Sequence, residues 1–520
     1  MSLPSVPPPY DLLVIGGGIN GAGIARDAAM RGLSVCLVEK DDLAAATSSA
    51  STKLVHGGLR YLEHGELRLV RESLIERERL LAIAPHIIWP LRFVLPHDAG
   101  LRPRWMLRLG LFLYDHIGGR RLLPATSGVD LTVPSHVGVL QERLSKGFEY
   151  SDCWVEDARL VVLNCMDARA RGAHIRTRTR CVALDRGESV WTATVRTSRG
   201  EETITARDVI NAAGPWVDTV LEQALPDQRH ANLRLVKGSH LIFPRLYEGE
   251  HCYIFQNRDG RILFAIPYEG AFTLVGTTDV LFTGDPAGID ISAEEAAYIC
   301  DAASEYFGAP LSPGQAVASY AGVRPLYEDK ASSNATVTRD YQFELDEGPG
   351  AGAPRILSIF GGKLTTYRKL AEHALRKLGV SGPSWTAKQP LPGGAIDPLR
   401  FDRFVAEQAR RFPWLEATTV LRFARAYGTR MGDMLGDASG PGDLGEHFGS
   451  GLTARELEYL VREEFAQTSE DVLRRRSKLY LHLSDEAQAQ VARWFEANVP
   501  APYIGSRTVA DCSRTGRTAP

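Results

Sequence analysis

The chain has 520 residues, of which 44% are apolar and 24% charged, and its formal net charge is −3. This length allows two to four structural units with a large core, and the near-neutral balance gives no global field of the kind that nucleic-acid binding uses. The seven cysteines are dispersed and none pairs as CxxC, which argues against a disulfide framework or a zinc site and indicates reduced, mostly buried thiols. We therefore expect neither a nucleic-acid partner nor a metal.

No secretory signal or membrane-spanning helix is expected. The first ten residues are proline-rich and lack both a basic and an apolar region, and no run of about 18 or more apolar residues occurs. These patterns leave peripheral attachment to a membrane open.

The first forty residues predict a strand, a turn, a helix and a second strand. Residues 11–15 (DLLVI) form a short apolar run that suits a strand buried on both faces. A helix is expected over residues 20–31, ended by Gly32, and the second buried strand over residues 34–39.

Strands and helices then alternate without an internal repeat. We expect antiparallel strands at 192–196 and 202–205, a buried strand at 209–213, a hairpin of a separate sheet at 261–266 and 272–276, and a last strand at 356–360 followed by a helix at 366–378.

The C-terminal part has helical periodicity. The Pro/Gly-rich stretch 388–397 reads as a linker, and residues 391–520 are expected to form a separate helical domain. Within it, Thr453 and Glu456 predict a capping box, before an apolar face formed by Leu457, Leu460, Val461 and Phe465. The tail after residue 501 gives no clear signal.

A dinucleotide fingerprint occupies the first turn. Gly16 permits a tight turn, Gly18 lets the backbone approach a pyrophosphate, and Gly21 allows helix and strand to touch. The pyrophosphate is then expected at the positive end of the helix, and Glu39 accepts hydrogen bonds from a ribose. A GxGxxG motif alone is weak evidence for nucleotide binding, but this one lies between a predicted strand and a predicted helix and is followed by an acid, Glu39, at the expected spacing.

Two later segments favour FAD over NAD. Residues 209–216 (VINAAGPW) place a strand against a glycine turn, and residues 358–366 (SIFGGKLTT) repeat the strand–glycine–helix arrangement. The N-terminus of that last helix would stabilise negative charge on a reduced flavin ring.

At residues 15–27 and 46–64 the chain resembles the bacterial aerobic glycerol-3-phosphate dehydrogenases, within the glycine-oxidase-like FAD oxidoreductases. The resemblance covers nearly the whole chain and is weakest at 121–146, 220–232 and the last twenty residues. The usual Ala-Thr-Gly is Ala212–Ala213–Gly214 here, which leaves the turn geometry intact. Further matching stretches are 102–116, 147–160, 237–240 (KGSH), 276–279 (GTTD), 322–325 (GVRP) and 360–374.

The resemblance implies a mixed α/β (α+β) fold. A Rossmann-like FAD-binding domain spans residues 1–390, interleaved with an antiparallel-sheet substrate domain at about 86–150 and 236–320, and a C-terminal all-helical domain follows. It also implies oxidation of sn-glycerol 3-phosphate to dihydroxyacetone phosphate by hydride transfer to FAD, with the electrons passed to ubiquinone.

A phosphate dianion needs a cationic clamp, and arginine suits it because its planar fork makes two bonds and stays charged. Arg60, Arg324 and Arg339 match the family's substrate-site arginines, with phosphate contact expected chiefly from Arg324 and Arg339, and Arg324 also counted as catalytic. Tyr61 and Thr278 complete the expected substrate set. The structural alternative is that each arginine forms a surface or interdomain ion pair.

The proton on the C2 hydroxyl needs a base with a pKa near neutrality. His56 is the candidate, because glycines beside it let the backbone approach the flavin and it lies four residues from Arg60. A lone histidine is more often structural. By resemblance and motif together, the expected cofactor-binding residues are Gly16, Gly18, Gly21, Glu39, Ser48, Ser49, Lys53, His56, Ala213, Gly214, Asp279, Gly361, Gly362, Lys363, Leu364 and Thr365.

Residues 101–121 are both basic and apolar, with Trp105, Phe112 and Tyr114 as amphipathic rings. Such a segment suits an anionic lipid headgroup layer, or a buried helix with arginines at its rim. Because the family delivers electrons to ubiquinone, we expect peripheral, monotopic attachment at the cytoplasmic face of the inner membrane. A homodimer is expected by resemblance only.

Three other functions compete. One is an oxygen-using glycerol-3-phosphate oxidase, which would make stoichiometric peroxide under air. Another is an amine or amino-acid oxidase, which the several arginines in substrate-like motifs disfavour. The third is a non-catalytic flavoprotein that serves as a scaffold or sensor. This reading does not explain why those arginines and His56 occur in substrate-like motifs.

Overall fold

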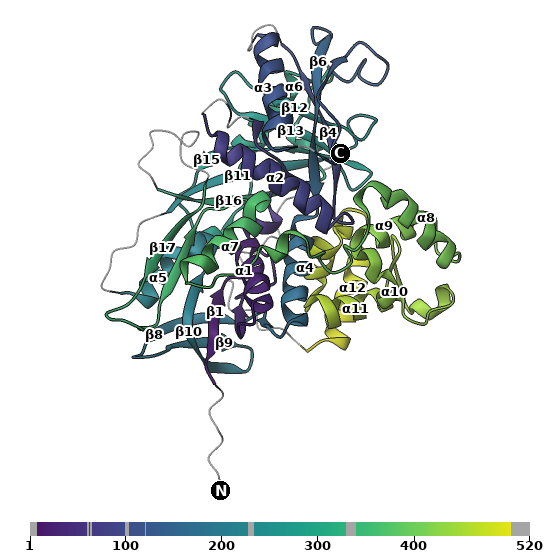
Figure 1. The fold of residues 1–520 in the computed structure, drawn as a ribbon. Coiled ribbons are helices and arrows are strands. Elements are labelled where there is room, and N and C mark those ends of the chain that lie inside the picture. Colours follow the sequence, from purple (N-terminus) through teal and green to yellow (C-terminus); the bar gives the residue numbers. More distant parts are fainter. Residues whose placement is uncertain are drawn as a thin grey trace.

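Two large β-sheets and a helical domain make up the described part of the protein, with the helical C-terminal domain packed beside α4 (Asp157–Ala170) (Figure 1). The structure is a computed structural model that describes residues 8–59, 62, 65–98, 103–119, 121–226, 233–328 and 340–500. The mixed α/β fold expected from the sequence is confirmed, and each sheet contributes one wall of the candidate site.

The first sheet has eight strands and a parallel centre. β1 (Tyr10–Ile15) lies between β2 (Val35–Val38) and β10 (Gly200–Asn211), and β18 (Ile356–Phe360) follows β10, all parallel. The segments expected at 202–205 and 209–213 are one strand, β10, whose first half pairs antiparallel with β9 (Trp191–Thr197) and whose second half pairs with β1. The remaining strands are β7 (His174–Arg176), β8 (Arg180–Arg186) and β17 (Gln342–Asp346).

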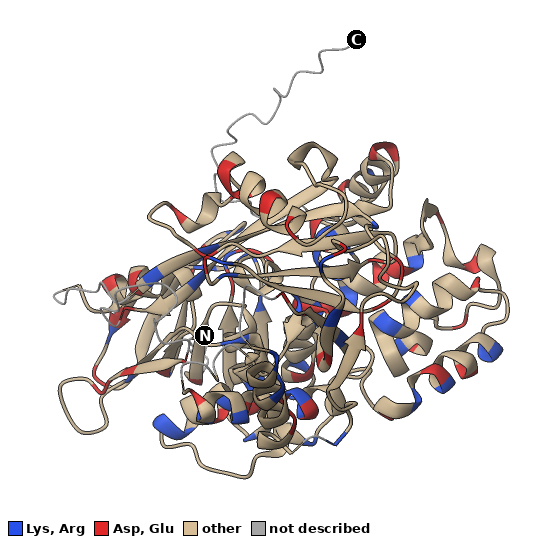
Figure 2. Ribbon diagram, turned by 90° about the horizontal axis from the view of Figure 1, so that it is seen from above, with Lys and Arg blue, Asp and Glu red and all other residues tan. Residues whose placement is uncertain are grey.

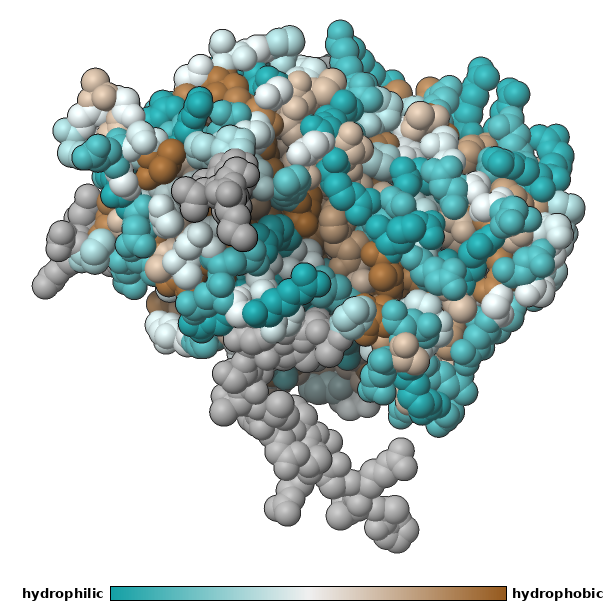
Figure 3. Space-filling model, turned by 90° about the horizontal axis from the view of Figure 1, so that it is seen from below, coloured by the Kyte–Doolittle hydropathy of each residue, from teal (hydrophilic) through white to brown (hydrophobic). Residues whose placement is uncertain are grey.

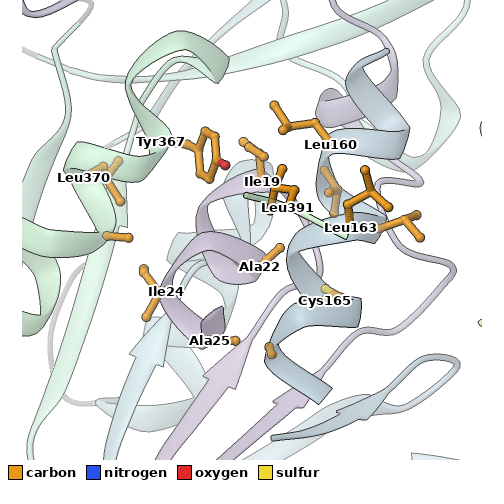
Figure 4. Packing of buried hydrophobic residues seen from close by; sticks show 14 of the residues in the cluster. Ile19, Ala22, Ile24, Ala25, Leu160, Leu163, Cys165, Tyr367, Leu370 and Leu391 are labelled. Carbon is orange, nitrogen blue, oxygen red and sulfur yellow. The ribbon is translucent and has the colours of Figure 1, made fainter. Parts of the chain in front are cut away.

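Helix α1 (Ile19–Met30) packs between α4 and α7 (Tyr367–Lys377) (Figure 4). Small residues permit this close packing: Ala22 and Ala25 are fully buried, and a Cβ added to Gly23 would meet the Tyr367 ring at 2.6 Å. The expected helix and its end before Gly32 are confirmed.

The second sheet has ten strands and is mainly antiparallel. The expected hairpin is present as β13 (Ile262–Tyr268) and β14 (Phe272–Gly276). One face of the sheet packs on α6 (Ala293–Ser304), and the other packs on α2 (Leu67–Ile83) and α3 (Arg104–Ile117). The other strands are β3 (Leu54–Val55), β4 (Ile88–Pro96), β5 (Ser127–Asp130), β6 (Lys146–Val155), β11 (Leu233–Pro244), β12 (Cys252–Gln256), β15 (Val280–Leu281) and β16 (Ala318–Tyr327).

The C-terminal domain is helical apart from one short hairpin, β19 (His447–Gly449) and β20 (Leu452–Thr453), which the all-helical expectation missed. The capping box expected at Thr453 and Glu456 is wrong. The Thr453 side chain makes no cap hydrogen bond, and the Glu456 carboxylate is buried and instead accepts two 2.7 Å hydrogen bonds from Arg422. The helices of the C-terminal domain are α8 (Phe401–Arg411), α9 (Ala417–Tyr427), α10 (Met431–Leu435), α11 (Ala454–Glu464) and α12 (Asp485–Asn498).

Helix α3 exposes part of its apolar surface. Trp105 is 67% exposed and Phe112 56%, whereas Tyr114 is 1% exposed. The expectation that Tyr114 is an interfacial ring is therefore wrong: its hydroxyl donates to both carboxylate oxygens of Asp152 at 2.8 Å inside the protein. A buried tyrosine hydroxyl needs a hydrogen-bond acceptor, and the Asp152 carboxylate supplies it and keeps the ring inside the protein.

Lys and Arg positions are interspersed with Asp and Glu positions along the chain in the view from above (Figure 2). In the opposite view, hydrophilic residues cover most of the visible face, with smaller apolar areas among them (Figure 3). Among the described residues, no helix combines the length and the apolar character needed to cross a membrane.

Candidate functional site

Three parallel strands of the first sheet end at one edge. Ile15 of β1 is in register with Asn211 of β10, and Asn211 with Ser358 of β18. Each strand runs into a glycine-containing turn, at Gly16, Gly214 and Gly361. In open α/β sheets, ligands bind in the crevice outside such carboxyl ends.

Two adjoining cavities of about 370 and 310 Å³ occupy this crevice. The larger is lined by the fingerprint turn and by Glu39, and the smaller by His56 and Arg324. Together they form a long trough that suits an extended dinucleotide. Their shared walls are Ile19, Thr47, Ser48, Pro325 and Gly362.

Two of the fingerprint glycines, Gly16 and Gly21, cannot carry side chains. A Cβ on Gly16 would lie 2.4 Å from the Ala212 carbonyl oxygen, and one on Gly21 would lie 2.0 Å from the Gly16 oxygen. Gly18 caps α1 without a side-chain hydrogen bond, and no acid occupies the first turn. The helix therefore presents backbone N–H groups to the crevice, as a pyrophosphate requires. Ser48 lies at the same terminus, where its Oγ accepts from the Ile19 amide at 3.0 Å.

Glu39 lines the larger cavity, as Ala213 and Gly214 do. Its carboxylate accepts hydrogen bonds from the backbone amides of Gly17, at 2.6 Å, and Asp41, at 2.8 Å. Burial raises the pKa of Glu39. A carboxylate has about four lone-pair sites, so two remain for other donors, as the expected ribose contact requires.

A second helix terminus faces the smaller cavity. Gly361 (φ +74°) and Gly362 (φ +96°) lead into a 3₁₀ turn, Leu364–Thr366, that continues into α7. Lys363, Leu364 and Thr365 line this cavity. The His56 amide donates to Thr365 Oγ1 at 3.3 Å, which joins the expected base to this turn.

Arg324 and Asp279 face the same cavity from the second sheet. Arg324 Nη2 donates to the Thr278 carbonyl at 3.1 Å and lies 3.4 Å from Asp279 Oδ1. The Thr278 hydroxyl accepts from the Ser239 amide and donates to Glu295. The Thr278 side chain therefore holds this segment against β11, and the Thr278 carbonyl orients Arg324.

Ser49 and Lys53, which were expected to bind the cofactor, do not line either of these two cavities. They line a third cavity of about 330 Å³, between the loop that carries them and residues 474–480 of the C-terminal domain. Lys53 Nζ is buried, 2.9 Å from Asp157 Oδ2, and donates to the Ser49 carbonyl at 3.0 Å. Three expected substrate residues, Arg60, Tyr61 and Arg339, fall outside the described residues.

Sequence reasoning missed His240 as a site residue, although its KGSH segment was noticed. His240 lines the smaller cavity, is 2% exposed, stacks on Tyr320 and places Nε2 3.0 Å from Thr52 Oγ1. Burial, with the charges of Lys53 and Arg324, lowers its pKa to about 3. Arg261 and Asp152 also line this cavity, and only the pairing of distant strands brings them there.

Residues 11–366 match the family model described as FAD dependent oxidoreductase, and residues 384–498 match that of the C-terminal domain of alpha-glycerophosphate oxidase. The chain is 53% identical to a glycerol-3-phosphate dehydrogenase from Pseudomonas aeruginosa, covering 94% of this chain and 96% of that protein. It is 47% identical to the aerobic glycerol-3-phosphate dehydrogenase of Escherichia coli, covering 93% and 97%.

A D-erythritol 1-phosphate dehydrogenase from Brucella abortus is also similar, at 48% identity over 95% of this chain and 99% of that one. Among solved structures, a glycerol-3-phosphate dehydrogenase from Bacillus halodurans, complexed with FAD, matches with a TM-score of 0.70, 30% identity and 94% coverage of both chains.

Proposed function

Because this chain belongs to the family of FAD-dependent glycerol-3-phosphate dehydrogenases, we propose that it oxidises sn-glycerol 3-phosphate to dihydroxyacetone phosphate. The cofactor is FAD, and the glycine turn that no side chain could occupy fits its pyrophosphate. Bound FAD supplies the acceptor for the hydride that leaves C2. The observation that supports the proposal most directly is the trough that joins the dinucleotide turn to Arg324, His56 and His240.

The chain's own residues would bind the substrate, orient it and remove one proton. We assign phosphate contact chiefly to Arg324 and Arg339, and place Arg60, Tyr61 and Thr278 in the rest of the substrate site. His56 is the proposed base for the C2 hydroxyl, and the hydrogen bond from its backbone amide to Thr365 Oγ1 fixes its backbone beside the N-terminal turn before α7. His240 is the competing base by position, because it lines the same cavity. Its pKa of about 3 makes it the weaker proton acceptor near neutral pH, which favours His56.

An anaerobic spectrum tests the proposal. Purified protein should show the visible bands of oxidised flavin, and glycerol 3-phosphate should bleach them without oxygen. D-erythritol 1-phosphate serves as the second substrate, since a 48% identical relative is named for it. Bleaching by the four-carbon substrate alone would move the proposal to that reaction, and a flavin that neither substrate reduces would refute it.

We further propose ubiquinone as the electron acceptor and peripheral binding to an anionic membrane, at the cytoplasmic face of the inner membrane. Helix α3 supports the membrane proposal, because it exposes one cluster of large apolar side chains: Trp105, Met106, Leu109, Phe112 and Leu113. Stoichiometric peroxide under air would instead favour the oxygen-using oxidase. A homodimer stays a prediction.

A further inference from the structure

One turn of the C-terminal domain holds the loop that follows β2. This loop carries Glu39, which lines the larger cavity of the trough, and continues to Asp42, which is 1% exposed. Arg475 Nε lies 2.6 Å from Asp42 Oδ2, and Arg476 binds both carboxylate oxygens, at 2.5 and 2.8 Å. Burial acts to raise the pKa of Asp42, but Arg476 and Arg475 hold it at about 2. This contact is therefore fully charged near neutral pH.

The same turn reaches the second cofactor loop through a relay of buried charges. Lys478 pairs with Glu156, and the adjacent Asp157 holds Lys53 at 2.9 Å and accepts from Ser51 Oγ at 2.8 Å. Lys53 has a positive φ of 60°, a conformation that L side chains rarely adopt. Its ion pair stabilises that backbone, and the loop it belongs to carries Thr47 and Ser48 into the trough.

A third connection runs through residues 176–179. Arg178 Nη2 binds Asp471 at 2.7 Å, in the π-helical turn Asp471–Arg476, while the Thr179 amide donates to the Glu39 carbonyl at 2.7 Å. The Arg178 amide donates to the Asp41 carbonyl at 2.9 Å. The C-terminal domain thus contacts the loop directly at Asp42 and, through residues 178 and 179, supports Glu39 and Asp41 as well.

Buried ion pairs contribute little net stability compared with apolar packing, but losing one partner leaves an uncompensated charge. Such pairs therefore serve better to fix one geometry than to stabilise the fold. We propose that Arg475, Arg476 and Lys478 are positioning residues for FAD, and that through them the C-terminal domain holds both cofactor loops in the binding conformation. None of the three lines the trough itself.

FAD affinity of the full-length apoprotein tests this. Arg476→Gln should weaken FAD binding by roughly tenfold or more, measured by flavin fluorescence quenching on titration, because Asp42 is left buried without its bidentate partner. Arg422→Gln is the matched control. Arg422 also makes two bonds to a buried carboxylate in the C-terminal domain, Glu456, but touches neither loop.

Both substitutions should lower the thermal midpoint of the apoprotein, whereas only Arg476→Gln should change the FAD dissociation constant. Arg476→Lys, which keeps the charge, should restore part of the affinity. Equal weakening by the two glutamine variants, or affinity within about twofold of wild type for Arg476→Gln, would overturn the proposal. If Arg476→Gln does not fold, Lys478→Met is tested in the same FAD-binding assay. The proposal predicts that this variant binds FAD more weakly, and unchanged FAD binding would contradict it.

Discussion

At the residue scale, the fingerprint glycines and the site histidines differ in how much the sequence reveals of them. Gly16, Gly18 and Gly21 are recognisable because each has a local steric task, and at Gly16 and Gly21 the structure places a backbone oxygen where the side chain would begin. His56 directly follows β3, whereas His240 lies within β11. Only the fold brings the two residues to one cavity. Their spacing in the chain carries no signal of that proximity.

Gly21→Ala should abolish high-affinity FAD binding. The added Cβ would lie 2.0 Å from the Gly16 oxygen, so α1 must move away from the turn at a cost of about 3 kcal/mol. Calorimetric titration of the apoprotein with FAD measures the loss, and Gly110→Ala, whose Cβ meets nothing within 4 Å, should bind FAD normally. A Gly21→Ala protein with wild-type affinity contradicts the steric argument.

Replacing each histidine separately identifies the base. His56→Asn should lower turnover by about 10²- to 10⁴-fold, as expected for losing a general base, while FAD stays bound. His240→Asn should have the smaller effect on turnover if His56 is the base. Anaerobic stopped-flow reduction measures both, and the reverse order would assign the base to His240.

At the element scale, helix α3 illustrates a pattern whose meaning depends on its surroundings. Its sequence is amphipathic, and the structure buries Leu107, Leu111 and Tyr114 against the second sheet while leaving Leu109 and Phe112 more than half exposed. Apolar side chains gathered on an exposed helix face indicate an interaction surface.

A double variant, Leu109→Ser with Phe112→Ser, should bind anionic vesicles at least about tenfold more weakly, because two apolar side chains no longer enter the interface. Vesicle co-sedimentation at low salt measures this. Leu399→Ser with Leu421→Ser removes two exposed leucines of the C-terminal domain and should leave vesicle binding unchanged. Equal binding by wild type and the α3 variant would exclude this helix as the contact.

At the scale of the whole molecule, the C-terminal domain is joined to the rest by buried polar contacts as well as by apolar packing. Arg159 of α4 binds Glu464 of α11 at 2.8 Å. His86 is fully buried where Gly393 meets Gly428, and a Cβ on Gly428 would lie 2.0 Å from the Gly393 oxygen. Burial, with the charges of Arg159 and Arg425, lowers the pKa of His86 to about 3.

This junction predicts acid sensitivity. Between pH 6.5 and 3 the unfolded chain protonates His86 and the folded protein does not, so stability falls by about 1.4 kcal/mol per pH unit as the pH decreases through that range. Above pH 6.5 this contribution is constant. His86→Leu should therefore show a shallower loss of thermal midpoint between pH 7 and 5, and parallel curves for the two proteins would contradict the prediction.

The sequence by itself determined the elements whose causes are local. The buried strands, the glycine turn, the helix after it and the hairpin at β13 and β14 follow from apolar runs, glycine sterics and period-two alternation, and all are present. The Glu456 half of the expected capping box is absent because its carboxylate binds Arg422, 34 residues away. Tyr114 failed as an interfacial ring for the same kind of reason, since Asp152 accepts its hydroxyl inside the protein.

Only the tertiary structure decided which charges meet. Lys53 matched the flavin loop in sequence, yet its ammonium is held by Asp157, and the neighbouring Glu156 binds Lys478 of the C-terminal domain. A long-range ion pair has no signature in local composition, because its energy depends on burial and distance, which exist only after the sheets and the helical domain have packed.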